Sequence, residues 1–303
     1  MEPRIDERAA GRLTGTIGQW DQGATCLAAL AVAAGAGPAD AGTAGPLVAA
    51  AREVMAAAGL GHELASPERL PFSPAQLTGM AAAPLLQAAA LVDGPKAAWA
   101  AQSDSALTAQ GQASGSAAVL FSRFVVPQFD DLADRLARPG ARMLDVGTGI
   151  GALAIGCAQT FPQLHVTGID VMPRVVELAR AQVAASPVSS RVELRQQDVT
   201  ELTDEACYDL AWIPAPFVPE PAFSTGIARM VTALRRGGLL MIGHGTFDGT
   251  DLQIAVTRFK TVVYGGTALD SPSAARLLKE HGLTSVQTVP TPPGAPGITV
   301  GRR

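Results

Sequence analysis

The chain has 303 residues, of which 48% are hydrophobic and 17% charged, and its net charge is −4. This length suffices for one α/β domain with a smaller partner, and the absence of a lysine or arginine cluster argues against a nucleic-acid partner. Three scattered cysteines without a Cys-x-x-Cys pair (Cys26, Cys157, Cys207) predict neither disulfides nor a metal site, and they favour a reducing, cytoplasmic compartment.

The first third of the chain is rich in alanine and shows helical periodicity. The apolar run 23–39 is the strongest candidate for a membrane span, but it is short, rich in alanine and glycine, and contains Pro38, so we expect a buried or dimer-interface helix. Glu2–Arg12 mixes acids and bases, unlike a signal peptide. The pattern predicts helices at Trp20–Ala34, at Leu47–Ala58, from Ser73-Pro74 and at Pro84–Val92, a loop over 35–46 and a linker over 102–116.

Beyond residue 116 the pattern alternates between strands and helices. A helix over 117–136 is followed by strands near 142–146, 165–170, 192–196, 208–213 and 238–243, a helix over 271–281, and a terminal pair at 285–289 and 298–301. This alternation predicts a doubly wound, mostly parallel α/β sheet. We therefore expect a helical region at 1–115, which covers a substrate or dimerises, and a catalytic domain at 116–303.

A glycine-rich turn follows the first of these strands, in the segment Leu144–Ala152 (LDVGTGIGA). Glycine permits positive φ and close approach of a ligand, and the following helix start offers free amides. Gly147, Gly149 and Ala152 also fit the dinucleotide pattern G-x-G-x-x-G/A, so the turn alone leaves a nicotinamide-dependent oxidoreductase open.

Three acids near this turn bear on which ligand it binds. Asp145 lies at the end of the first strand, where a carboxylate repels a pyrophosphate and attracts a cationic amino acid. Asp170 and Asp198 end the next two strands, so the acids should line one crevice.

At these residues the chain resembles the class I, Rossmann-like S-adenosylmethionine (SAM) methyltransferases. Five segments match in family order: LDVGTGIGALA, GIDVMPRVVELAR, QQDVTEL, YDLAWIPAPF and LRRGGLLMIG. The resemblance covers about residues 115–303 and implies a seven-stranded sheet with one antiparallel strand, with SAM as cofactor and S-adenosylhomocysteine (SAH) as product. It implies that Asp170 binds the ribose hydroxyls and Asp198 the adenine amine. The cofactor residues carried over are Asp145, Gly147, Thr148, Gly149, Gly151, Asp170, Val171, Asp198, Val199, Ile213 and Pro214.

The end of the fourth strand departs from part of that family. Members that methylate amino groups of bases or glutamine hold Asn or Asp where this chain has Pro214. Proline has no donor and its neighbours are apolar, so the departure favours a small, largely apolar substrate over DNA, rRNA or a protein glutamine.

His244 is the candidate general base, because it follows the fifth strand and imidazole titrates near neutrality. Asp248 and Asp251 are placed to orient it or to cap the next helix. A histidine bonded only to backbone is the alternative.

The candidate substrate residues are Trp20, Gln112, Phe217 and His244, with Trp99 and Phe121 as further aromatics that either line a pocket or pack in the core. Gln112, Ser114 and Ser116 lie in the predicted linker, which should pass over the cofactor.

These features together predict a SAM-dependent methyltransferase of bacterial secondary metabolism. It should act on an oxygen, or alternatively a carbon, of a small molecule, without a membrane partner and with dimerisation through the N-terminal helices. The alternatives are a SAM-binding scaffold without methyl transfer, such as a cyclase or regulator, and the oxidoreductase.

Overall fold

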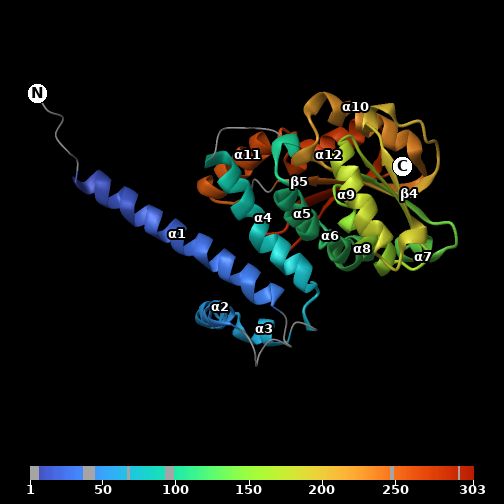
Figure 1. Cartoon of the computed structure of the whole chain (residues 1–303). Coiled ribbons are helices and arrows are strands. Elements are labelled where there is room, and N and C mark those ends of the chain that lie inside the picture. The colour runs from blue at the N-terminus through green and yellow to red at the C-terminus, as the bar shows by residue number, and fades with distance from the viewer. Residues whose placement is uncertain (1–6, 37–44, 67–68, 93–98, 246–248, 293) are drawn as a thin grey trace, which may run out of the picture.

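The computed structural model describes residues 7–36, 45–66, 69–92, 99–245, 249–292 and 294–303. Helices that project to one side make up the N-terminal part, and an α/β layered body makes up the rest (Figure 1).

One sheet of seven strands organises the body, in the order β3-β2-β1-β4-β5-β7-β6. The strands are β1 (Arg142–Val146), β2 (His165–Asp170), β3 (Val192–Gln196), β4 (Tyr208–Pro214), β5 (Leu234–His244), β6 (Thr284–Val289) and β7 (Gly297–Arg302). Strands β1 to β5 pair in parallel, while β7 is antiparallel to both β5 and β6. The predicted mostly parallel sheet with a terminal hairpin is confirmed.

Both faces of this sheet are covered, which explains the nearly continuous apolar strands. In β4, Trp212 belongs to the core cluster on one face and Ile213 to the cluster on the other. The body's helices are α7 (Leu132–Ala137), α8 (Ala152–Thr160), α9 (Pro173–Ala184), α10 (Glu220–Ala233), α11 (Asp251–Tyr264) and α12 (Ser271–Glu280). Short helical turns are η4 (Phe121–Val125), η5 (Val126–Gln128), η6 (Ser189–Arg191), η7 (Val199–Glu201) and η8 (Ala215–Phe217).

The strand order reverses between β1 and β4. In an open parallel sheet, this reversal leaves a crevice outside the carboxyl ends of the two strands, where ligands bind. The fold therefore places the glycine turn after β1 and the Pro214 segment after β4 on either side of one crevice.

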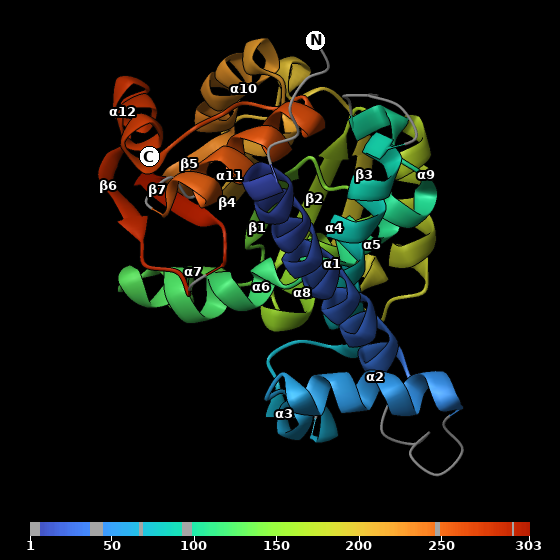
Figure 2. The same ribbon diagram turned by 90° about the vertical axis from the view of Figure 1, so that its left-hand side faces the viewer.

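The N-terminal part consists of α1 (Glu7–Gly35), α2 (Pro46–Ala57), α3 (Gly61–Ala65), α4 (Pro74–Val92), η3 (Trp99–Ala101), α5 (Asp104–Ser114) and α6 (Ala117–Leu120). Helix α1 packs on α2 and α4, and α4 packs on α5 (Figure 2). Among the described helices, α4 is long and apolar enough to cross a membrane, yet in the structure it lies between α1 and α5.

Three predicted elements need correction. Most of the predicted linker 102–116 is helix α5, which Ser103 caps by accepting a hydrogen bond from the Ala106 amide at 3.2 Å. Pro84 does not begin a helix but lies inside α4. The predicted helix 117–136 breaks up, because η4 is a π-turn and Pro127 follows it. Most of the predicted loop 35–46 lies outside the described residues.

Candidate active site

The turn after β1 has the backbone that its glycines predict. Gly147, Gly149 and Gly151 take φ values of 66°, 58° and 78°, a region that side chains disfavour. Within the turn, the Thr148 amide donates to the Ile169 carbonyl of β2 at 3.0 Å. Gly151 is the N-cap of α8, so the turn leads directly into a helix start that faces the crevice.

Asp170 fixes this turn to the end of β2. Its Oδ2 accepts a hydrogen bond from the Gly149 amide at 3.1 Å, and its Oδ1 accepts one from the Met172 amide at 3.0 Å. Burial raises the pKa of the carboxyl despite these bonds. A carboxylate has about four acceptor positions, so acceptor capacity remains for the two hydroxyls of a ribose.

Asp145 lies deeper than the sequence indicated. The side chain is 1% exposed, and its Oδ2 accepts a hydrogen bond from the Thr148 hydroxyl at 2.7 Å. Burial raises the pKa of this carboxyl to about 7, against the Thr148 bond and with the help of the nearby Asp170 charge. The expectation that Asp145 faces the ligand is thus corrected: Asp145 and Thr148 support the turn from below.

Asp198 begins η7 at the end of the third strand segment. Its Oδ1 accepts a hydrogen bond from the Thr200 amide at 2.8 Å, and the half-buried carboxylate keeps Oδ2 for another donor. The neighbouring Val199 is a core residue, and so is Ile213 in β4. The side chains of these two residues pack in the core, and their assignment to the cofactor site stays a prediction.

Pro214 and Val171 lie at the rim of the crevice. A Cβ built on Gly147 would come within 3.8 Å of the Pro214 side chain, so β4 and the glycine turn share one wall. Val171, directly after Asp170, is 56% exposed. The polar groups of this crevice fit an adenosyl cofactor, because Asp170 and Asp198 keep free acceptor positions and the glycine turn leaves space for a ligand.

Helix α5 covers the glycine turn through small residues. A Cβ on Gly111 would overlap the Ile150 side chain, and one on Gly115 would come within 3.3 Å of Ala152 Cβ. Gln112 is half-buried on this helix. At the start of α5, Asp104 forms a 3.0 Å ion pair with Arg174 of α9, next to the Asp170 turn. These two contacts attach the helical part to the side of the crevice formed by the turns after β1 and β2.

His244 is not placed to act as a base. It is 1% exposed, with Nδ1 2.9 Å from the Gly245 carbonyl and Nε2 2.9 Å from the Thr299 hydroxyl. Burial lowers the pKa of the imidazole. The expectation of His244 as catalytic and substrate-binding is corrected, because both ring nitrogens already form hydrogen bonds, one with the Thr299 hydroxyl of β7 and one with the carbonyl of the next residue, Gly245. Asp248 lies outside the described residues, and Asp251 is exposed in the first turn of α11, after the cap Thr250.

Three aromatic rings from separate elements meet at the end of β4. Phe217 of η8 stacks on Tyr264 of α11 with ring centroids 4.5 Å apart, and Trp99 of η3 meets both rings edge-on, at 5.1 and 5.6 Å. Tyr264 was missed at the sequence level, although the glycine pair after it marked a tight turn. Phe121 packs on Trp212 in the core.

Trp20 makes no ring contact with this cluster among the described residues. It is 61% exposed on α1, the helix that projects from the molecule (Figure 1). Its assignment as a substrate residue stays a prediction.

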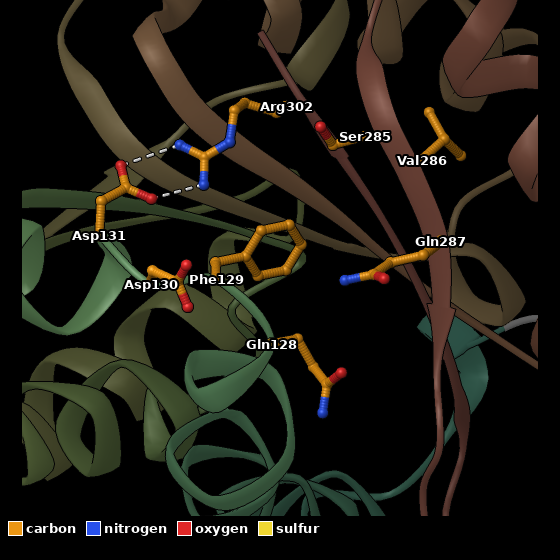
Figure 3. A pocket seen from close by; sticks show the side chains of 8 residues that line it. All are labelled: Gln128, Phe129, Asp130, Asp131, Ser285, Val286, Gln287 and Arg302. Atoms are coloured by element: carbon orange, nitrogen blue, oxygen red, sulfur yellow. Dashed lines mark hydrogen bonds and ion pairs between the residues drawn. The ribbon is translucent and has the colours of Figure 1, made fainter.

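Two open cavities lie at the opposite edge of the sheet. One, of about 460 Å³, is lined by residues of η5, β6 and β7, including Arg302 in a bidentate ion pair with Asp131 (Figure 3). The other, of about 590 Å³, lies at the amino ends of β1, β2 and β3. Neither cavity is lined by residues of the glycine turn. The strand order and the polar groups at the strand ends therefore locate the candidate site better than cavity size does.

Known proteins with similar sequence agree with this location. Residues 143–238 match the model of a methyltransferase domain. This match agrees with the resemblance to class I, SAM-dependent methyltransferases over the same residues. SAM is the cofactor that this resemblance implies, and Asp170 and Asp198 lie at the strand ends where the resemblance places its adenosine part.

The most similar curated sequences differ in their substrates. A release factor glutamine methyltransferase of Rhodopirellula baltica is 28% identical over 130 residues, 42% of this chain and 43% of its own length. A tRNA1(Val) (adenine(37)-N6)-methyltransferase of Porphyromonas gingivalis is 44% identical over 63 residues, 21% of this chain and 25% of its own. The chain thus spans less than half the length of these relatives.

Solved structures match over nearly the whole chain. Human N-acetylserotonin methyltransferase in complex with SAM superposes with a TM-score of 0.63 at 18% identity, covering 100% of this chain and 99% of that one. The mitomycin 7-O-methyltransferase MmcR gives 0.58 at 20% identity, with 98% and 100% covered. At these identities the likeness establishes a shared fold, including the N-terminal helices.

Proposed function

We propose that the chain transfers a methyl group from SAM to an oxygen atom of a small, largely apolar acceptor. The observation that carries this proposal is the composition of the methyl-acceptor side of the crevice. Pro214 lies beside Gly147, and Phe217 of the η8 turn that follows contacts the rings of Trp99 and Tyr264. Such walls offer contact area to an apolar molecule and few acceptors for an amine.

Bound SAM supplies a methyl group on a positively charged sulfur. The chain's own contribution is alignment and exclusion of water, which together lower the barrier of a displacement. Asp170 orients the ribose side, and α5 packs on Ile150 and Ala152 at the end of the glycine turn. Because His244 is buried with both ring nitrogens bonded, it offers no general base for the acceptor, which favours an acceptor hydroxyl acidic enough to ionise on its own.

The N-terminal helices support a small acceptor over a macromolecular one. They cover the crevice from α4 and α5, and both similar solved structures named above carry a corresponding part. A macromolecular substrate would need that face open. Methylation at carbon is the second candidate, since an apolar wall also suits a carbon nucleophile.

The remaining expectations stay proposals of the same kind. We propose a cytoplasmic protein of bacterial secondary metabolism that binds neither nucleic acid nor membrane and dimerises through α1. Three exposed apolar residues on one face of that helix, Leu13, Ile17 and Trp20, support the dimer.

A labelling experiment tests the proposal. The protein is incubated with methyl-labelled SAM and a panel of phenols, hydroxylated heterocycles, a tRNA pool and a glutamine-containing peptide. We expect label in a low-molecular-weight hydroxylated acceptor as an alkali-stable methyl ether. Label in tRNA or peptide refutes the acceptor class, and SAM binding without transfer to any acceptor favours the non-transferring scaffold.

A further inference from the structure

A series of side-chain hydrogen bonds connects the helical part to α11. The Tyr264 hydroxyl donates to Gln87 Oε1 of α4 at 2.7 Å, and Gln87 Nε2 donates to Gln110 Oε1 of α5 at 2.9 Å. Gln110 Nε2 then donates to the Ser114 hydroxyl at 3.3 Å. Gln87 is 5% exposed in an otherwise alanine-rich helix. A buried amide of this kind is costly unless bonded, so the series fixes where Tyr264 points its proton.

The phenol oxygen of Tyr264 keeps acceptor capacity. Its only proton is donated to Gln87, and among the described residues no donor bonds to this oxygen. Burial raises the pKa of the phenol to about 12, so it stays protonated at neutral pH and cannot act as a base. What remains is an oxygen that accepts one hydrogen bond and donates none to a newcomer.

The end of α11 that carries Tyr264 is attached to the segment that follows β4. A Cβ on Gly266 would overlap the Pro216 carbonyl, so the turn after α11 lies directly on η8. The Thr267 amide donates to the Ala215 carbonyl at 2.8 Å, which fixes the same contact. Tyr264 is thereby held next to Phe217, three residues after Pro214, on the acceptor side of the crevice.

We propose that Tyr264 orients the acceptor substrate: its phenol oxygen accepts a hydrogen bond from a hydroxyl group of a planar aromatic molecule that packs against Trp99 and Phe217. The aromatic edges and faces of this cluster favour a flat ring. The Ser114 hydroxyl donates to the Gln110 backbone carbonyl at 2.9 Å, which favours this direction along the series and leaves the phenol oxygen to a ligand that donates. This inference rests on the proposed function and narrows its acceptor class.

The test compares two ligands, of which one has a hydroxyl group that can donate a hydrogen bond and the other carries a methyl ether in its place. Equilibrium binding of 2-naphthol and of its methyl ether is measured on the SAH-loaded protein, for the wild type, Tyr264→Phe and Val262→Ala. Tyr264→Phe keeps the ring and loses the oxygen, while Val262 lies on the exposed face of the same helix at 67% exposure.

We expect the wild type and Val262→Ala to prefer 2-naphthol over the ether by roughly three- to tenfold, the range for one neutral hydrogen bond. Tyr264→Phe should reduce this preference to about one while binding SAH as before. A wild type that binds neither ligand, or a preference that survives in Tyr264→Phe, overturns the inference.

The proposed function fails separately. If the labelled panel shows no transfer to oxygen while the naphthol preference depends on Tyr264, the acceptor site stands and the reaction is wrong. If oxygen methylation is found and the preference for 2-naphthol is independent of Tyr264, the proposed reaction stands and the role of Tyr264 is wrong.

Discussion

Asp145 is the residue whose environment departs furthest from the sequence-based expectation. An ionisable group under a closed turn, close to a second carboxylate, costs free energy when charged. Its carboxyl has a pKa of about 7 in the folded chain and an ordinary value of 3.8 when unfolded. Below pH 4 the proton is bound in both states, and between pH 4 and 7 only the folded state keeps it. The contribution of this carboxyl to the free energy of unfolding is therefore fully present below pH 4, and it is lost as the pH rises through 7.

Replacing Asp145 with Asn should stabilise the protein at alkaline pH. The amide oxygen still accepts from Thr148 and cannot ionise, so we expect a gain of about 2–4 kcal/mol at pH 8 that vanishes below pH 4. Thermal unfolding at both pH values measures it. Asp134→Asn, at an exposed position of α7, is the control. Equal melting temperatures of wild type and Asp145→Asn at pH 8 would contradict the buried carboxyl.

The sequence predicted which acids end the strands but not how deeply each is buried. Asp170 and Asp198 lie at strand ends as expected, because alternation and turn signals determine register. His244 is buried by Gly297, its partner in β7, where a Cβ would overlap the imidazole. That pairing joins residues more than fifty positions apart, which no local pattern reveals.

At the scale of elements, the contact between α5 and the glycine turn decides how the cofactor crevice is closed. Glycine inside a helix costs about 1 kcal/mol relative to alanine. Position 111 of α5 nevertheless holds a glycine, because the Ile150 side chain occupies the space that a Cβ would need there. Because Ile150 belongs to the turn itself, this packing connects the helical part to cofactor binding.

Gly111→Ala should weaken SAH binding severalfold and lower stability, although alanine favours a helix. Gly23→Ala is the matched control, since that glycine is also helical and nothing lies within 4 Å of its Cβ position. We expect the control to be stabilised slightly and to bind SAH as the wild type does. Calorimetric titration and thermal unfolding of both variants check this, and the expectation fails if the two behave alike.

Helix α5 was not predicted, because its composition of Ser, Gln and Gly is typical of a linker. Its helical state depends on the Ser103 cap and on burial of Ala106, Leu107 and Ala109 against neighbouring helices. Tertiary packing thus overrides propensity here, whereas the strands, with their continuous apolar runs, were located to within a few residues.

At the scale of the whole molecule, α1 stands apart. Leu13, Ile17 and Trp20 recur at the spacing of one helix face and are 61%, 51% and 61% exposed. A face of this kind is typical of an interface between copies of a chain.

We expect a dimer in sedimentation analysis and a monomer when these three residues are changed to glutamate. Leu47→Glu, at another exposed apolar position with 70% exposure, should leave the dimer intact. A wild-type monomer at tens of micromolar concentration would refute the interface.

The overall architecture was the most predictable level. Alternation indicated the parallel sheet, and the resemblance to methyltransferases implied seven strands with one antiparallel. The sequence also predicted, without giving the strand order, that the acids at successive strand ends line one crevice. It did not indicate the aromatic cluster that closes it, since Trp99, Phe217 and Tyr264 come from three distant segments.

Calorimetric titration with SAH tests the central claim most directly, in the wild type, in Asp170→Ala and in Glu177→Ala, which removes an equal charge at an exposed position of α9. The account predicts micromolar binding by the wild type and Glu177→Ala, and a loss of at least about tenfold in Asp170→Ala, because the carboxylate holds two hydroxyls. Tight binding of NADH in place of SAH, or SAH affinity unchanged in Asp170→Ala, would contradict it.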